Sequence, residues 1–215
     1  VIYLIQNFQR INKSNDGKLN INDFERIKDA IQLSKKFKLP TIFFVDNKGI
    51  NNTFKNEISG IANLLSENIK LLSNHEEPLI SIITGETTSE GSLPYFISDS
   101  VLMLEYSILN TGLDSAGKDI LSAYDCLETG IIDKIIQEPP LGASKGLEDM
   151  SRLIKISLIN QLSILNYTSK RKLVKSRIKK FQAIDMSHKK LTESVSNEIK
   201  IWRNVLRAGY KALRS

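Results

Sequence analysis

Two short apolar runs constrain the fold of this chain most strongly, because each opens with a proline and closes with a glycine-containing turn. One run spans Pro40 to Gly49 and has the sequence PTIFFVDNKG, and the other spans Pro78 to Leu93 and has the sequence PLISIITGETTSEGSL. Both are rich in β-branched residues, which is typical of strands that are buried in a parallel sheet and feed helices. Ligands of α/β folds bind at the carboxyl ends of such strands, so we expect the function to reside in these two turns.

The composition is that of a globular protein, with 215 residues of which 41% are hydrophobic and 25% are charged. No apolar run approaches the roughly 20 residues that cross a bilayer, so we expect a cytoplasmic protein without membrane contact. The single cysteine, Cys126, excludes an internal disulfide framework and a cysteine-based zinc cluster, and we expect it to be a core thiol. His75 and His188 are isolated from other ligand-type residues, so we expect no metal site. Val1 already has the pattern of a strand, and we expect the chain to be a piece of a longer polypeptide.

The positive charge lies in the C-terminal part of the chain. The net charge is +6, yet 14 of the 30 Lys and Arg residues and only 3 of the 24 Asp and Glu residues follow Tyr167. The basic segment 170–180 is therefore expected to face an acidic partner or the phosphates of a ligand, or to be a solvated helix face. Nucleic acid is disfavoured, because few aromatic residues are interleaved with the basic ones.

The order of the predicted elements indicates an α/β fold. Strands are expected over residues 1–6, 41–45, 79–84, 100–104 and 131–136, and helices over about 20–38, 57–73, 148–182 and 192–213. A turn over residues 85–90 is expected to open a short helix. Alternation of strands and helices favours right-handed β–α–β units and a mostly parallel sheet. We expect one domain over residues 1–146 and a helical extension with a basic arm over residues 147–215.

The motifs occur in an order that resembles the alpha-type carboxyltransferase component of biotin-dependent acetyl-CoA carboxylase, which has a crotonase-like fold. The resemblance covers residues of about 28 to 142, and its segments are Ala30–Pro40, Phe44–Gly49, Gly60–Ala62, Thr84–Leu93, Asp99–Glu105 and Gly130–Pro139. It implies a ClpP/crotonase β–α–β superhelix with a long C-terminal helical extension.

The resemblance also implies a reaction and its participants. Members of this family transfer the carboxyl group of carboxybiotin, held on a biotin carboxyl carrier protein, to acetyl-CoA, and malonyl-CoA for fatty acid synthesis is formed. They work as oligomers with a beta-type half. Negative charge develops on substrate oxygens, which backbone N–H groups can stabilise. By this resemblance the backbone amides of Thr87 and Thr88 are the expected oxyanion donors, and Gly49, Gly85 and Gly91 are the expected substrate-binding residues.

The sequence differs from the family pattern in both turns. Thr87, Thr88 and Glu90 stand where the family has glycine, and Asn47 opens a segment that is Thr-Pro-Gly-Ala in the family. A β-branched residue resists positive φ, and a carboxylate beside a developing anion is unfavourable unless it points away. The alternative function is therefore a degenerate, non-catalytic carboxyltransferase-like subunit that acts as a scaffold or partner of an active paralogue.

Overall fold

The computed structural model describes residues 2–7, 17–51, 53–112, 120–140, 142–180 and 182, with the backbone alone for residues 2–7. The chain divides into two compact units, residues 1–179 and 180–215, and the description that follows concerns the first. The predicted helix over residues 192–213 lies outside the described residues. The predicted domain division after Gly146 stays a prediction.

A parallel sheet of five strands in the order β1-β2-β3-β5-β8 forms the centre of the unit. Its strands are β1 (Ile2–Asn7), β2 (Thr41–Asp46), β3 (Leu79–Ile83), β5 (Ser100–Leu104) and β8 (Lys134–Ile136). All five were predicted, although β8 was expected to begin at Ile131. The parallel arrangement confirms the predicted α/β class, and β2, β3 and β5 owe their position to nearly continuous apolar sequence.

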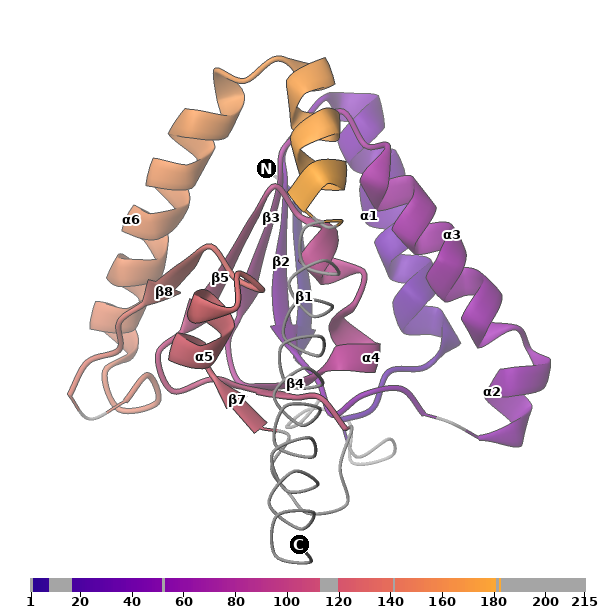
Figure 1. Ribbon diagram of the computed structural model, residues 1–215, viewed down its shortest axis with the longest axis horizontal. Helices are drawn as coiled ribbons and strands as arrows, with labels where there is room; N and C mark the ends of the chain where they lie inside the picture. The colour runs from indigo at the N-terminus through magenta and orange to yellow at the C-terminus, as the bar shows by residue number, and fades with distance from the viewer. Residues whose placement is uncertain are drawn as a thin grey trace, which may run out of the picture. The chain divides into compact units, whose positions relative to one another are not determined.

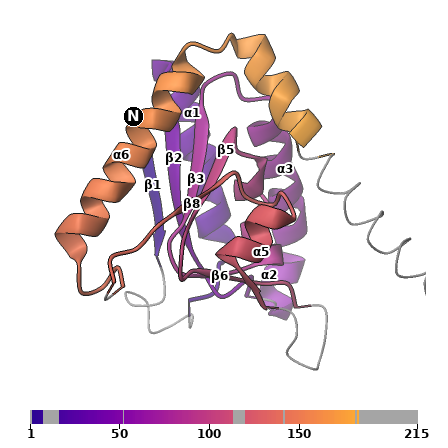
Figure 2. The ribbon, with the colours of Figure 1, turned by 60° about the vertical axis from the view of Figure 1, so that its left-hand side comes forward.

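Helices cover both faces of this sheet. The helices α1 (Ile21–Phe37) and α3 (Ile61–Ser73) lie on one face, and α6 (Leu147–Asn166) lies on the other (Figures 1 and 2). The α6 face has a core of buried side chains, in which Ile42, Ile80 and Leu102 from the strands meet Met150 and Leu158 from α6. The apolar faces of the helices are what hold them to the sheet.

Local capping explains where the helices begin and end. Asn20 caps α1 through a capping box, in which its side chain accepts from the Asp23 amide and the Asp23 carboxylate accepts from the Asn20 amide. The single helix predicted over residues 57–73 is wrong, because the chain forms α2 (Phe54–Ile58) and then α3. Gly60 separates the two helices with a φ of 83°, a left-handed conformation that glycine adopts without strain.

A small second sheet lies at the carboxyl end of the central sheet (Figure 1). It contains β4 (Glu86–Thr88), β6 (Ile108–Asn110) and β7 (Ile120–Ser122), in the order β4-β6-β7. The prediction of a simple turn over residues 85–90 is therefore wrong in part, since Glu86–Thr88 pairs in parallel with β6. The short helices α4 (Ser89–Ser92), which was predicted, and α5 (Ala123–Glu128), which was not, flank this sheet, and Tyr95–Ile97 forms a 3-10 turn, η1.

The long helix predicted over residues 148–182 is also wrong, because α6 ends at Asn166 and a second helix covers residues 170–179. The chain turns at residues 167–169, where the amide of Thr168 bonds the carbonyl of Leu165 and the carbonyl of Ser169 accepts from Leu173. Leu165, near the end of α6, and Leu173, in the second helix, both lie in the core between α6 and the sheet. The 170–179 helix thus folds back over the amino end of the sheet instead of extending away (Figure 2). Within the part of the chain that the structure describes, no helix has the length and apolar character needed to cross a bilayer.

Candidate functional site

The turns that follow β2 and β3 meet at the carboxyl end of the sheet, where the sequence placed the function. The amide of Thr84 donates to the carbonyl of Val45 at 2.9 Å, and the amide of Asn47 donates to the carbonyl of Glu86 at 2.9 Å. Because these bonds join the two strand ends directly, the turn after β2 lies against β4.

Buried side chains reinforce this junction. Asn47 is fully buried, and its Nδ2 donates to Oγ1 of Thr87 at 3.3 Å while its Oδ1 accepts from the amide of Gly49 at 3.1 Å. Thr88 is the N-cap of α4, and its Oγ1 accepts from the amide of Gly91 at 3.2 Å. The structure therefore brings together four of the five residues predicted for the site: Gly49, Thr87, Thr88 and Gly91.

The glycines of the site are required by packing. A Cβ on Gly91 would lie 2.3 Å from Oδ1 of Asn47, and a Cβ on Gly49, whose φ is +98°, would lie 3.0 Å from Oγ1 of Thr88. The fifth predicted residue, Gly85, lies beside the end of β2, where a Cβ would come within 2.6 Å of Oδ1 of Asp46. A side chain at Gly85 or Gly91 would therefore force the side chain of Asp46 or Asn47 to move.

The predicted site residues differ in how far they reach solvent. Gly49, Thr87 and Gly91 are buried, whereas Gly85 and Thr88 are partly exposed. Of the five predicted residues, Gly85 and Thr88 are therefore the ones accessible from solvent, and the substrate-binding role of the glycines and the oxyanion role of the Thr87 and Thr88 amides stay predictions. Glu90 is exposed, so its carboxylate is solvated. Solvation weakens its repulsion of an anion at this edge.

Two carboxylates hold the neighbouring loops at the same end of the sheet. Glu105 follows β5 and accepts hydrogen bonds from the hydroxyl of Tyr124 at 2.8 Å and from the amide of Glu138 at 3.2 Å. Glu138 in turn accepts from the amides of Tyr106 at 3.1 Å and Ala143 at 2.7 Å. The two glutamates act as loop caps, since backbone amides donate to both oxygens of Glu138 and to one oxygen of Glu105.

The 170–179 helix contributes a residue that sequence reasoning placed wrongly. Arg177 was expected within a basic arm, but it is 1% exposed and forms an ion pair with Asp99, with Nη2 2.7 Å from Oδ2 and Nε 3.0 Å from Oδ1. Its guanidinium also donates to the carbonyls of Leu72 at 2.6 Å and His75 at 2.7 Å. Arg177 therefore fastens this helix to the end of α3 and to the strands.

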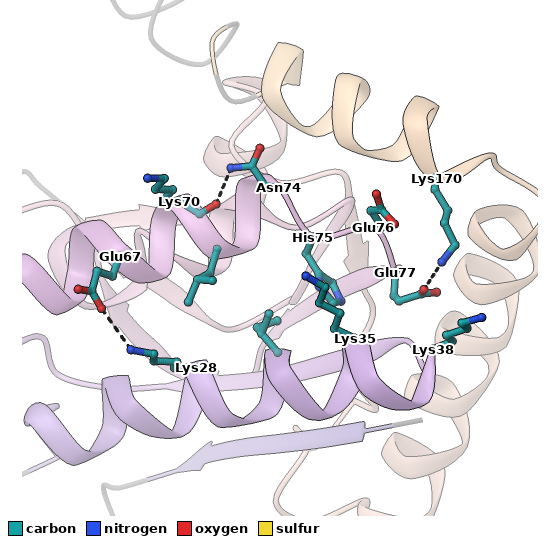
Figure 3. Close-up of a pocket in the computed structure, with 12 residues that line it drawn as sticks. Lys28, Lys35, Lys38, Glu67, Lys70, Asn74, His75, Glu76, Glu77 and Lys170 are labelled. Carbon is teal, nitrogen blue, oxygen red and sulfur yellow. Dashed lines mark hydrogen bonds and ion pairs between the residues drawn. The ribbon is translucent and has the colours of Figure 1, made fainter.

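A cavity of about 720 Å³ lies beside this contact, between the C-terminal halves of α1 and α3 (Figure 3). Its mouth has ion pairs between Lys28 and Glu67 at 3.5 Å and between Lys170 and Glu77. His75 forms part of its wall and shares a 2.7 Å hydrogen bond with Oγ of Ser34. Burial, followed by the charge of Arg177, lowers the pKa of His75 to about 4, so this imidazole is neutral near pH 7.

The remaining candidates for chemistry are inert or dispersed. Cys126 is fully buried, as predicted, and burial raises the pKa of its thiol to about 12, which suppresses the reactive thiolate. Among the described residues, no three His, Cys, Asp or Glu side chains come together in a group that could hold a metal ion.

Solved structures share this arrangement of sheet and helices. A Pseudomonas malonate decarboxylase hetero-tetramer in complex with coenzyme A superposes with a TM-score of 0.67 at 12% identity, over 89% of this chain and 85% of that chain. An enoyl-CoA hydratase from Bacillus halodurans superposes with a TM-score of 0.60 at 10% identity, over 89% of this chain and 87% of that one. The fold is therefore crotonase-like, as predicted.

The sequence narrows this class to one family. Residues 7–185 match the family described as acetyl co-enzyme A carboxylase carboxyltransferase-like, and the chain belongs to this family. The acetyl-coenzyme A carboxylase carboxyl transferase subunit alpha of Geobacter metallireducens is 30% identical over 184 residues, which cover 78% of this chain and 58% of that protein. A protein of Natranaerobius thermophilus named for subunits beta/alpha is 31% identical over 186 residues, 79% of this chain and 31% of its own length. The chain thus spans less than two thirds of these relatives.

Proposed function

We propose that this chain is the alpha-type component of an acetyl-CoA carboxylase carboxyltransferase, which moves the carboxyl group of carboxybiotin to acetyl-CoA and yields malonyl-CoA for fatty acid synthesis. The observation that supports this most strongly is the family match over residues 7–185. The two glycine-containing turns also meet at the carboxyl end of the sheet, where ligands of α/β folds bind. The names of the relatives support the same reaction.

In this proposal the chain provides a rigid strand-end backbone. Carboxybiotin supplies the activated carboxyl group, and negative charge then develops on its ureido oxygen and on the thioester oxygen of the acceptor. N–H donors that are already aimed at such an oxygen stabilise it, and one donor is worth about 2.7–4 kcal/mol. Thr88, which is partly exposed, is the predicted donor that a substrate can reach, and buried Thr87 anchors the strand beneath it. Gly85 lets the substrate approach the backbone closely.

The residues present fit an anionic transition state in two respects. The turn backbone is held by hydrogen bonds at both Gly49 and Gly91, so little reorganisation is needed when charge develops. The Glu90 carboxylate is exposed to water, which screens it from the site.

The proposal includes partners. A relative named for subunits beta/alpha shows that a beta-type half accompanies the alpha half in that protein. We infer that this chain works in an oligomer with a beta-type half that holds acetyl-CoA, and that a biotin carboxyl carrier protein delivers carboxybiotin to the Gly85–Gly91 segment. The scaffold alternative requires the same complex without turnover.

The test combines the full-length protein with a beta-type half, biotinylated carrier protein and malonyl-CoA, and follows the reverse transfer. We expect Gly85→Ala to reduce kcat at least about tenfold, because its Cβ would lie 2.6 Å from Asp46 Oδ1 and would force this side chain at the end of β2 to move, while also narrowing the approach to the backbone. Gly130→Ala is the matched control, since this glycine has a φ of +74° and nothing within 4 Å of a Cβ. It introduces backbone strain away from the site. Complex formation without turnover in the wild type would leave the scaffold function.

A further inference from the structure

We propose that Asn47 is the positioning residue of this site, and that Thr87 is the hydroxyl partner that completes its hydrogen bonding. The fully buried Asn47 side chain joins the turn after β2 to the segment Thr87–Gly91 and so fixes the backbone of that segment. The effect of Asn47 on catalysis rests on the proposed function. Its role in holding the two turns together rests only on the contacts of its side chain.

Asn47 contacts both sides of the junction with different groups. Its amide donates to the Glu86 carbonyl at 2.9 Å, its Nδ2 donates to Thr87 Oγ1 at 3.3 Å, and its Oδ1 accepts from the Gly49 amide at 3.1 Å. An asparagine side chain has both a donor and an acceptor, and this place uses both. Aspartate lacks the donor for Thr87, and alanine lacks both groups.

The shape of the neighbouring backbone also depends on Asn47. Oδ1 occupies the space where a Cβ on Gly91 would lie, at 2.3 Å, and the α-carbon of Gly49 lies 3.1 Å from the same point. The φ of Gly91 is outside the left-handed region, so its backbone conformation does not itself demand glycine. The space for a side chain at position 91 is therefore limited first by Asn47 and then by the Gly49 backbone.

Asn47 and Thr87 come together from distant parts of the sequence. Thr87 supplies a hydroxyl, and Asn47 supplies the amide group that donates to it from 40 residues earlier. Both residues are 0% exposed, so neither has water as an alternative partner. We infer that the hydrogen bond between Asn47 and Thr87 restricts the backbone of the segment Thr87–Gly91 and so orients Thr88 toward the substrate.

The first experiment measures amide hydrogen exchange in the full-length protein. In Asn47→Ala the Gly49 and Gly91 amides should exchange at least tenfold faster than in the wild type, and Thr87→Val should accelerate the Gly91 amide in the same direction. Thr87→Ser keeps the hydroxyl and should restore slow exchange. Asn68→Ala is the matched control, because Asn68 is 1% exposed and its Nδ2 donates to the Phe24 carbonyl at 2.9 Å, away from the site.

A suppressor pair tests the packing argument. Gly91→Ala should accelerate exchange across residues 87–91. Adding Asn47→Ala should bring the double variant to within about twofold of Asn47→Ala alone, since the 2.3 Å contact with Oδ1 is gone and the 3.1 Å approach to the Gly49 α-carbon is the tight contact that remains. Adding the control substitution Asn68→Ala to Gly91→Ala should leave exchange across residues 87–91 as fast as in Gly91→Ala alone. If Asn47→Ala leaves the Gly49 and Gly91 amides as slow as Asn68→Ala does, or if Gly91→Ala is equally harmful with and without Asn47, the positioning role is refuted.

The second experiment measures the reverse carboxyl transfer with the partners named above. Asn47→Ala should lower kcat at least about tenfold with KM for malonyl-CoA changed less than about threefold, because a displaced donor affects the transition state more than substrate binding. Thr87→Ser should retain most activity. A wild type that forms the complex without turnover refutes the proposed function, while the exchange data still decide the role of Asn47. Faster exchange with unchanged kcat would refute positioning for catalysis.

Discussion

Replacing Arg177 by methionine should destabilise the protein severely, because the change removes one partner of a buried ion pair. The guanidinium and the Asp99 carboxylate are 0% and 3% exposed, with Nη2 2.7 Å from Oδ2. Methionine fills similar volume but leaves the carboxylate with only the Leu79 amide, at 2.8 Å, among the donors that surround it in the described residues. The carbonyls of Leu72 and His75 lose their charged donor as well.

The expected magnitude follows from these contacts. Removing one member of a buried pair typically costs about 3–5 kcal/mol, out of about 5–15 kcal/mol for a whole domain. With an m-value of about 2 kcal/mol/M, the urea midpoint should fall by about 1.5–2.5 M. Arg177→Lys keeps the charge but has no planar fork, so it should recover only part of the loss.

Urea unfolding followed by far-UV circular dichroism measures the effect. Arg171→Met is the matched control, since Arg171 is exposed on the same helix and should change stability by less than about 0.5 kcal/mol. Adding Asp99→Asn to Arg177→Met should restore part of the stability, because the uncompensated charge is removed. If the free energy of unfolding of Arg177→Met is within about 1 kcal/mol of that of the Arg171→Met control, the buried contacts of Arg177 do not hold the 170–179 helix in place.

Three further predictions follow from single residues. His75 has a pKa lowered from 6.5 to about 4, chiefly by burial, so its contribution to stability is complete above pH 6.5 and is lost as the pH falls toward 4. The loss should reach about 3 kcal/mol, and a His75→Gln variant should lack this slope in urea midpoints measured from pH 4 to 7. Cys126, with its thiol pKa raised to about 12, should not react with a disulfide reagent at pH 8 in the native protein and should react fully in denaturant. Gly60→Ala should cost about 1–2 kcal/mol in urea unfolding through left-handed strain alone, since only Asn63 Nδ2, at 3.8 Å, is near its Cβ; an unchanged midpoint would contradict the assigned backbone.

The central sheet was predictable because its strands are local apolar runs. Thr41–Asp46 and Leu79–Ile83 are each bounded by proline and by a turn, and the pattern alone identifies them. The second sheet was missed, because strands of three residues such as Ile108–Asn110 and Ile120–Ser122 show no measurable alternation. The end of α6 was missed for a related reason. The segment Tyr167–Ser169 contains no glycine or proline, and apolar spacing continues through it.

The location of the site could be predicted from the sequence, but the contacts that build it could not. The sequence indicated that Gly49, Gly85, Thr87, Thr88 and Gly91 follow strand ends, and the topology brings strand ends to one edge. It did not indicate that Asn47 fills the space between them, because its partner Thr87 is 40 residues away. The burial of Arg177 could not be predicted for the same reason, since the carbonyl of Leu72 to which it donates is 105 residues away in sequence.

The most direct test of the proposed function is the carrier-dependent loss of malonyl-CoA. The full-length protein, a beta-type half and biotinylated carrier protein are mixed, and acetyl-CoA is measured as it forms. We expect acetyl-CoA to appear only when this chain and biotinylated carrier are both present, and we expect Gly85→Ala to reduce the rate at least about tenfold while Gly130→Ala does not. A stable complex in which acetyl-CoA does not form, or forms at a rate independent of Gly85, would contradict the proposed function.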